Sequence, residues 1–264
     1  MEVNKVLFIN QEITPYVADT EMSVAGKELP NVIQQKGHEI RTFMPKWGVI
    51  NERRGQLHEV IRLSGMNLII DDTDHQLIIK VASIAQTRVQ VYFIDNDEFF
   101  CNHDMTIGED GKPHAQNVER AVFFARGVLE TVKKLRWIPE VIHCQGWMSS
   151  IVPAYIKVAY KDEPSFANVK VVTTVCANEV EGNVGEGFGR KCNFKDATAE
   201  LMSAYGDNPT YNNLLQLAID YSDGVAIAPS ADKTVADYAR NKGIKVLELE
   251  EGNFDAYNDF FENL

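Results

Sequence analysis

The sequence predicts an α/β protein, a Rossmann-like three-layer sandwich with a mainly parallel sheet. Short, strongly apolar runs, such as residues 5–10 and 169–175, are typical of strands buried on both faces. Amphipathic segments separate these runs, and the clearest is residues 117–135, where apolar residues recur at helical spacing. Such alternation of strands and helices indicates a parallel sheet with helices on both faces.

The remaining elements continue this alternation. Strands are expected at 5–10, 39–44, 89–95, 140–144, 169–175, 223–230 and 245–249. Helices are expected at 22–37, 117–135, 147–157, 208–221, 235–241 and 253–264. The irregular part between them has apolar runs at 57–63 and 68–84, with a hairpin turn at 71–74. In the first helix, the residues expected to face inward are Val24, Leu29, Val32 and Ile33.

Composition and charge narrow the classes of function. The formal net charge of −12 argues against nucleic acid and an anionic membrane as partners, because both require a basic surface. The sequence shows no apolar run of membrane-spanning length and no signal peptide, and its four cysteines form no C-x-x-C pair, so a cytoplasmic protein with reduced thiols is expected. Cys101, His103 and His114 lack the spacing of a standard zinc site, so no metal is expected.

Several motifs carry a resemblance to a known family. The chain has Asn-x-x-Arg-x-x-x-Phe-x-x-Gly-x-Leu-Glu from Asn117, Pro-Glu-Val-Ile-His-Cys-x-x-Trp from Pro139, and Val-Pro-Ala-Tyr from Val152. Glu-Ile-Thr-Pro from Glu12 and Met-Pro-Lys-Trp-Gly from Met44 extend the match. Together these motifs resemble the glycogen/starch synthase family. That family transfers glucose from ADP-glucose to an α-1,4-glucan, and its two Rossmann-like domains face each other across a cleft, the GT-B arrangement.

The resemblance runs from Lys5 to about Ser230 and matches only the first of the family's two domains. Residues 1–264 are therefore expected to form a single domain, equivalent to the N-terminal domain of a GT-B glycosyltransferase. The second domain, which in the family carries the Arg, Lys and Glu residues that bind the nucleotide and the pyrophosphate, is expected to be absent.

The loop after the first strand departs from the family. Where the family has Lys-x-Gly-Gly-Leu, whose lysine and glycine backbone approach the donor's phosphates and sugar, this chain has Ala-Asp-Thr-Glu-Met-Ser at 18–23. Two carboxylates at this place repel a pyrophosphate. The same residues are typical of a helix start, with Thr20 or Ser23 as N-cap and the acids Asp19 and Glu21 against the helix dipole.

Strand ends supply the candidate site residues, because ligands of open parallel sheets lie outside the carboxyl ends of the strands. His143 is the candidate catalytic residue, and it is either a core histidine or a donor in the cleft. The family usually has His-Asp-Trp where this chain has Gln145-Gly146-Trp147, and the tryptophan either packs under the helix start or stacks on a sugar. The candidate substrate-binding residues that the resemblance implies are Glu12, Thr20, Ser23, Trp147 and Asn178.

A further candidate follows the strand at 169–175. Cys176 takes the histidine position of the family's Thr-x-His-Asn motif. The glycine-rich segment 182–191 then ends in two cations, and it is expected to be a mobile loop or, alternatively, a substitute anion site.

Two readings of function remain. The first is a glycosyltransferase of the glycogen/starch synthase type, with ADP-glucose as donor substrate and no cofactor. This enzyme needs a synthase partner chain or a homo-oligomer to complete the cleft that holds the α-glucan. The second is a catalytically inactive glucan-binding or regulatory partner of a full-length synthase. A third, weaker class is a small Rossmann-like enzyme that uses a different nucleotide. A dinucleotide is not expected, because no G-x-G-x-x-G motif follows a strand.

Overall fold

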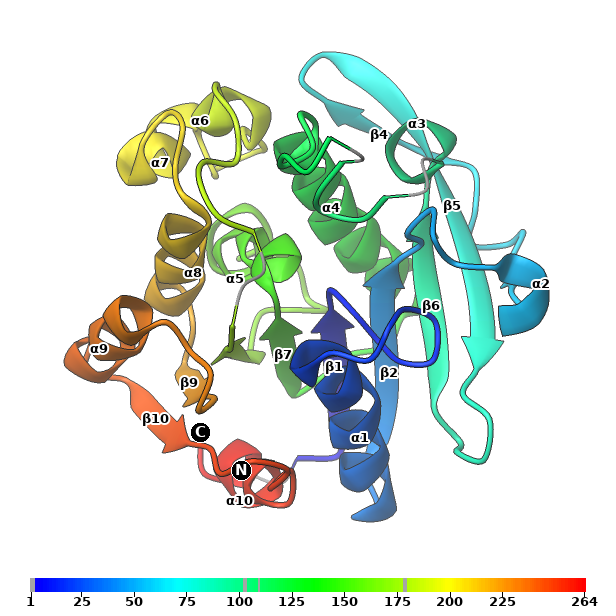
Figure 1. Ribbon diagram of the computed structural model, residues 1–264, viewed down its shortest axis with the longest axis vertical. Coiled ribbons are helices and arrows are strands. Elements are labelled where there is room, and N and C mark those ends of the chain that lie inside the picture. Colours follow the sequence, from blue (N-terminus) through cyan, green and yellow to red (C-terminus); the bar gives the residue numbers. More distant parts are fainter. Residues whose placement is uncertain (1–2, 102–103, 109, 178–179) are drawn as a thin grey trace.

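The computed structural model describes residues 3–101, 104–108, 110–177 and 180–264. Its centre is a mainly parallel sheet in the order β10-β9-β8-β7-β1-β2-β6-β5-β3, with β4 paired to β5 (Figure 1). The parallel strands are β1 (Lys5–Asn10), β2 (Glu39–Pro45), β6 (Gln90–Asp95), β7 (Val141–Gln145), β8 (Lys170–Val175), β9 (Gly224–Ile227) and β10 (Lys245–Glu248). The antiparallel strands are β3 (His58–Glu59), β4 (Met66–Ile70) and β5 (Thr73–Ser83).

Helices cover both faces of the sheet, which confirms the predicted α/β class. The longer ones are α1 (Glu21–Gln35), α4 (Asn117–Leu135), α8 (Tyr211–Asp220), α9 (Lys233–Asn241) and α10 (Ala256–Glu262). Short helical segments are α2 (Glu52–Gly55), α3 (Asp97–Phe100), η1 (Trp147–Ser149), α5 (Ile151–Ala154), η2 (Tyr155–Ala159), α6 (Phe188–Lys191), α7 (Ala199–Met202) and η3 (Ser203–Tyr205). None of the helices among these described residues is long and apolar enough to cross a membrane.

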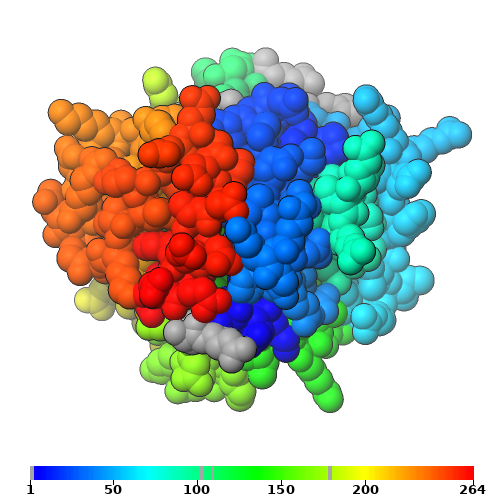
Figure 2. Space-filling model, turned by 90° about the horizontal axis from the view of Figure 1, so that it is seen from below, coloured from blue at the N-terminus to red at the C-terminus, as the bar shows by residue number. Residues whose placement is uncertain are grey.

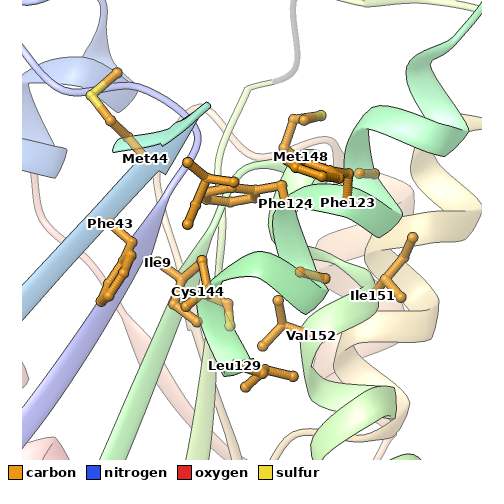
Figure 3. Close-up of a cluster of buried hydrophobic side chains, with 14 of the residues drawn as sticks. Ile9, Phe43, Met44, Phe123, Phe124, Leu129, Cys144, Met148, Ile151 and Val152 are labelled. Carbon is orange, nitrogen blue, oxygen red and sulfur yellow. The ribbon is translucent and has the colours of Figure 1, made fainter. Parts of the chain in front are cut away.

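The two faces of β1 enter two different cores, because successive side chains of a strand point to opposite sides. Leu7 and Ile9 pack in the large core with α4 and α5, and Figure 3 shows part of this cluster around Ile9. Val6 and Phe8 pack in a smaller core with α1 and α10. The C-terminal α10 thus covers the sheet face beside α1, and the two ends of the chain lie close together (Figure 1).

Most predicted elements are present, and three expectations need correction. Val24 was expected to face inward, but it is exposed on α1. The run at 57–63 contributes only the two-residue β3. The expected single helix at 147–157 is a composite of a 3-10 turn, the short α5 and one turn of π-helix. Pro153 has no N–H to continue the backbone hydrogen bonds from the 3-10 turn into α5.

Candidate functional site

The candidate site lies where the order of the strands reverses. The chain proceeds from β1 to β2 on one side of β1, and returns later with β7 on its other side. The carboxyl ends of β1 and β7 therefore border a crevice, which is the usual ligand position in open parallel sheets. A backbone hydrogen bond of 3.1 Å from Gln11 N to Gln145 O joins the two strand ends.

Glu12 and Thr20 meet at this crevice. Thr20 is the N-cap of α1, and its Oγ1 accepts a hydrogen bond of 2.9 Å from the Ser23 amide while it donates one of 2.8 Å to Glu12 Oε2. The Glu12 carboxylate, only 5% exposed, is thereby fixed near the amino end of α1, where the helix dipole favours negative charge. The structure brings these two candidate residues together.

Ser23 belongs to the helix start rather than to the crevice surface. Its hydroxyl accepts a hydrogen bond from the Thr20 amide at 2.8 Å and donates to Ala18 O at 2.9 Å, which completes a capping box. The side chain is fully buried. The helix-start interpretation of residues 18–23 therefore describes the local structure.

The structure has no room for a side chain at Gly146, between Gln145 and Trp147. Its backbone, at φ +84° and ψ 156°, occupies a region that is nearly restricted to glycine. A Cβ at this position would lie 2.6 Å from Gln11 Cβ and 2.9 Å from Met22 Sδ. Gln11 fills the space, and its Oε1 accepts a hydrogen bond of 3.2 Å from the Met148 amide.

Gln11 is thus a site residue that sequence reasoning missed. Its Nε2 also donates a hydrogen bond of 3.2 Å to Glu12 Oε1, so one side chain links the loop after β1 to the start of the segment after β7. The signal in the sequence was the glycine at position 146. In a packed interior, the space that a missing side chain leaves is filled by a neighbouring residue, which here is Gln11.

Two adjoining cavities open at this edge. The smaller one, of about 60 Å³, is lined by Gln11, Glu12, Thr20, Glu21, Met22 and Ala177. The larger one, of about 440 Å³, is lined by Ala177, Val180, Glu181, Gly182, Thr210, Tyr211, Asn212, Ser230 and Asp232. Among the residues that the structure describes, carboxylates line both cavities and no lysine, arginine or histidine does, so the crevice is negative.

His143 lies in the core and not in the crevice. It is fully buried beside Phe8 and Tyr257, and its Nε2 is 2.7 Å from Thr174 Oγ1. Burial lowers the pKa of His143 to about 3, so the ring is neutral near pH 7. Of the two alternatives for this residue, the geometry matches the core histidine.

Trp147 is also buried, and its ring meets Tyr211 edge to face with ring centroids 4.8 Å apart. This position matches packing under the helix start. Asn178, the remaining candidate, lies outside the described residues. His103 also lies outside them, and the described part of the chain holds no cluster of three or more His, Cys, Asp or Glu able to bind a metal.

The polar groups of the glycine-rich segment 182–191 are paired with other residues of the protein. The amides of Gly185 and Gly187 donate to the side chains of Asn208 and Asp207 at 3.1 and 3.2 Å. The cations that end the segment are paired as well, Arg190 with Asp71 and Lys191 with Glu119. These contacts do not support the substitute anion site.

Comparisons with known proteins identify the family. The family model for the starch synthase catalytic domain matches residues 5–234. The glycogen synthase of Chlorobium limicola is 34% identical over 254 residues, which are 95% of this chain and 51% of that protein. The glycogen synthase of Chlorobaculum tepidum is 35% identical over 223 residues, or 83% of this chain and 44% of that protein.

Among solved structures, the catalytic domain of starch synthase IV from Arabidopsis thaliana, bound to ADP and acarbose, superposes with a TM-score of 0.73. It is 17% identical, and the match covers 94% of this chain and 52% of that one. The fold is therefore that of one part of a GT-B glycosyltransferase. The chain belongs to the glycogen/starch synthase family, and it spans about half the length of the two curated relatives described above.

Proposed function

We propose that these residues form one wall of a glycogen/starch-synthase-type active site, which transfers glucosyl units from ADP-glucose to an α-1,4-glucan. The observation that carries the proposal is the family match over residues 5–234, which includes both strands that border the crevice. A row of carboxylate and amide side chains along that crevice supplies hydrogen-bond acceptors for sugar hydroxyls, as a neutral glucan requires.

We also propose that residues 1–264 alone do not form a complete transferase site, and the negative charge of the crevice supports this. When glucose leaves ADP-glucose, negative charge develops on the departing diphosphate, and catalysis needs preorganised positive groups at that place. The described crevice lining offers Glu12, Glu21, Glu181 and Asp232 and no cation. The positive groups must come from another chain, a second copy or a further segment.

A second candidate function is a catalytically inactive partner that binds glucan or regulates a full-length synthase. The specific observation in its favour is Gly146, which stands where the family usually has an aspartate and which Gln11 approaches so closely that no side chain fits there. Position 146 therefore supplies no carboxylate to the crevice. Both functions share the glucan-facing wall and differ in whether donor chemistry takes place beside it.

The cytoplasm is the compartment we propose for either function. Cys144, Cys176 and Cys192 are buried free thiols. Reduced cysteines of this kind are typical of proteins in a reducing compartment.

The test measures incorporation of labelled glucose from ADP-glucose into glycogen, together with retention of the folded protein on glycogen. We expect retention without incorporation for residues 1–264 alone, and incorporation when a partner supplies the cationic half. Incorporation by these residues alone would contradict the proposed incompleteness. Loss of both activities would contradict the glucan-facing wall, and stimulation of an already active synthase would favour the regulatory function.

A further inference from the structure

A cavity of about 460 Å³ lies between α2, the loop after β1 and the hairpin that joins β5 to β6. Figure 2 shows this side of the molecule at its right, with the segment around α2 (light blue) next to that hairpin (blue-green). The cavity shares no lining residue with the two cavities of the crevice. Its lining includes Tyr16, Ile50, Asn51, Arg54, Gln56 and Ser83.

Ion pairs fix the wall of the cavity that α2 forms. Glu52 Oε1 lies 2.9 Å from Lys46 Nζ and 2.7 Å from Lys80 Nζ, and Lys80 also pairs with the buried Asp95 at 2.8 Å. These contacts tie α2 to β5 and to the ends of β2 and β6. Because two lysines already engage Glu52, this carboxylate is not left to neutralise the arginines that follow it in α2.

Arg54 is a cation without a local counter-ion. Within the described ranges it forms no ion pair, and no aspartate or glutamate lines the cavity there. The chain as a whole has a net charge of −12, so an unneutralised arginine in a cavity lining is a local exception to its negative potential. A guanidinium group prefers a phosphate or a carboxylate, to which it donates two parallel hydrogen bonds.

Amide and hydroxyl groups accompany this cation in the lining. Asn51, Gln56 and Ser83 are exposed residues whose side chains carry N–H or O–H donors. Asn51 Oδ1 accepts a hydrogen bond of 2.9 Å from the Arg54 amide, so the donor that remains on this side chain is Nδ2. Such donors can complete the hydrogen bonds of an oxyanion once the guanidinium has engaged part of it.

Apolar surface forms another part of the lining. Tyr16 and Ile50 are 9% and 5% exposed, and the Tyr16 ring meets Phe93 of β6 edge to face, with ring centroids 4.9 Å apart. This packing holds the ring in place as a rigid wall. Apolar surface of this kind contributes nothing to the binding of a bare phosphate, but it favours an organic group attached to one. The volume is within the range of small-molecule sites, about 300–1,000 Å³.

We propose that this cavity binds a small organic anion, an aromatic phosphate or carboxylate. The oxyanion of the ligand accepts hydrogen bonds from Arg54 and from the neighbouring amide and hydroxyl donors. Its ring lies against Tyr16 and Ile50. This site lies outside the glucan-facing crevice, and the proposal does not depend on the transferase function.

The first experiment separates the ring from the charge by calorimetric titration of the folded protein at one ionic strength. The probes are phenyl phosphate, benzoate, inorganic phosphate, which has the charge without the ring, and benzyl alcohol, which has the ring without the charge. We expect saturable binding of at least one aromatic anion, and at least about tenfold weaker binding of inorganic phosphate and of benzyl alcohol. Equal affinity for inorganic phosphate would overturn the proposal, because it indicates an adventitious ion only, and so would no binding of either aromatic anion.

The second experiment places the anion in the cavity. Arg54→Gln removes the guanidinium, and we expect the Kd of the tighter aromatic anion to rise about tenfold or more. Arg53→Gln is the matched control, because this adjacent, exposed arginine of α2 lies outside the lining and its loss changes the net charge equally. We expect its Kd to stay within about twofold of the wild type. An equal rise in both variants, or no rise in Arg54→Gln, would overturn the proposal.

Discussion

The Thr20 hydroxyl donates a hydrogen bond of 2.8 Å to Glu12 while it caps α1. One threonine thus couples the helix start to the carboxylate at the end of β1. Gly26 permits this arrangement, because a Cβ there would lie 2.2 Å from Glu12 O. The close approach of α1 to the loop after β1 therefore fixes the geometry of the crevice wall.

Replacement of Thr20 by valine should remove both functions of its hydroxyl. We expect Thr20→Val to lower the free energy of unfolding by about 1–2 kcal/mol, because α1 loses its N-cap and Glu12 loses a donor. Urea denaturation followed by circular dichroism measures the change. Thr20→Ser is the matched control, since it retains the hydroxyl and should stay within about 0.5 kcal/mol of the wild type. Equal stabilities of the two variants would show that the hydroxyl does not matter.

Gly146 should not tolerate any side chain. We expect Gly146→Ala to cost about 3 kcal/mol or more, because an unfavourable backbone conformation adds to the overlap with Gln11. Gly37→Ala is the control, since Gly37 also has positive φ (+103°) but a Cβ there would meet nothing within 4 Å. That control should cost only about 1 kcal/mol. Similar losses in chemical denaturation would contradict the packing of Gln11 against Gly146.

The regular elements could be predicted from the sequence because their signals are local. The central parallel strands β1, β7 and β8 are apolar runs of five or six residues, and α4 shows its apolar stripe in one continuous segment. The hairpin turn at 71–74 was also readable, and Asp71 and Asp72 connect β4 to β5 with positive φ. The family motifs added the order of the elements up to residue 230.

Much of the site could not be predicted, because its contacts join residues that are distant in the sequence. Gln11 meets Met148 across 137 positions, and His143 is covered by α10 from the end of the chain. No local pattern indicates that α10 returns to this face of the sheet. Val24 was expected to be buried but is exposed, for the same reason. The helical period predicts which side chains of α1 share one face, but not which of them other segments of the chain cover.

The buried His143 should make the protein acid-sensitive. Its pKa is about 3 in the folded state, whereas an unfolded histidine has a pKa near 6.5. Between these values the unfolded chain binds a proton that the folded chain does not, so stability falls as the pH decreases from about 6.5 towards 3. The expected slope reaches at most about 1.4 kcal/mol per pH unit.

The measurement compares urea midpoints of the wild type and His143→Gln at several values between pH 7 and pH 4. Glutamine retains a hydrogen-bonding group toward Thr174 but does not titrate, so the variant should lose less stability on acidification. His58→Gln, at an exposed position, should follow the wild type. Parallel profiles for all three proteins would contradict a neutral, buried His143.

Reversal of charge at Glu21 should strengthen binding of the nucleotide donor. In the proposed function, ADP-glucose reacts beside the crevice wall that Glu21 lines, and the carboxylate of Glu21 repels a diphosphate that comes near it. We expect Glu21→Lys to lower the Kd for ADP-glucose about tenfold at low salt, because an attraction replaces a repulsion, and to lose part of the gain at high salt. Thermal stabilisation at increasing ADP-glucose concentration measures the Kd. Glu200→Lys changes the net charge equally at an exposed position of α7 and should leave the Kd unchanged. Equal affinities of the two lysine variants would show that the diphosphate does not approach α1.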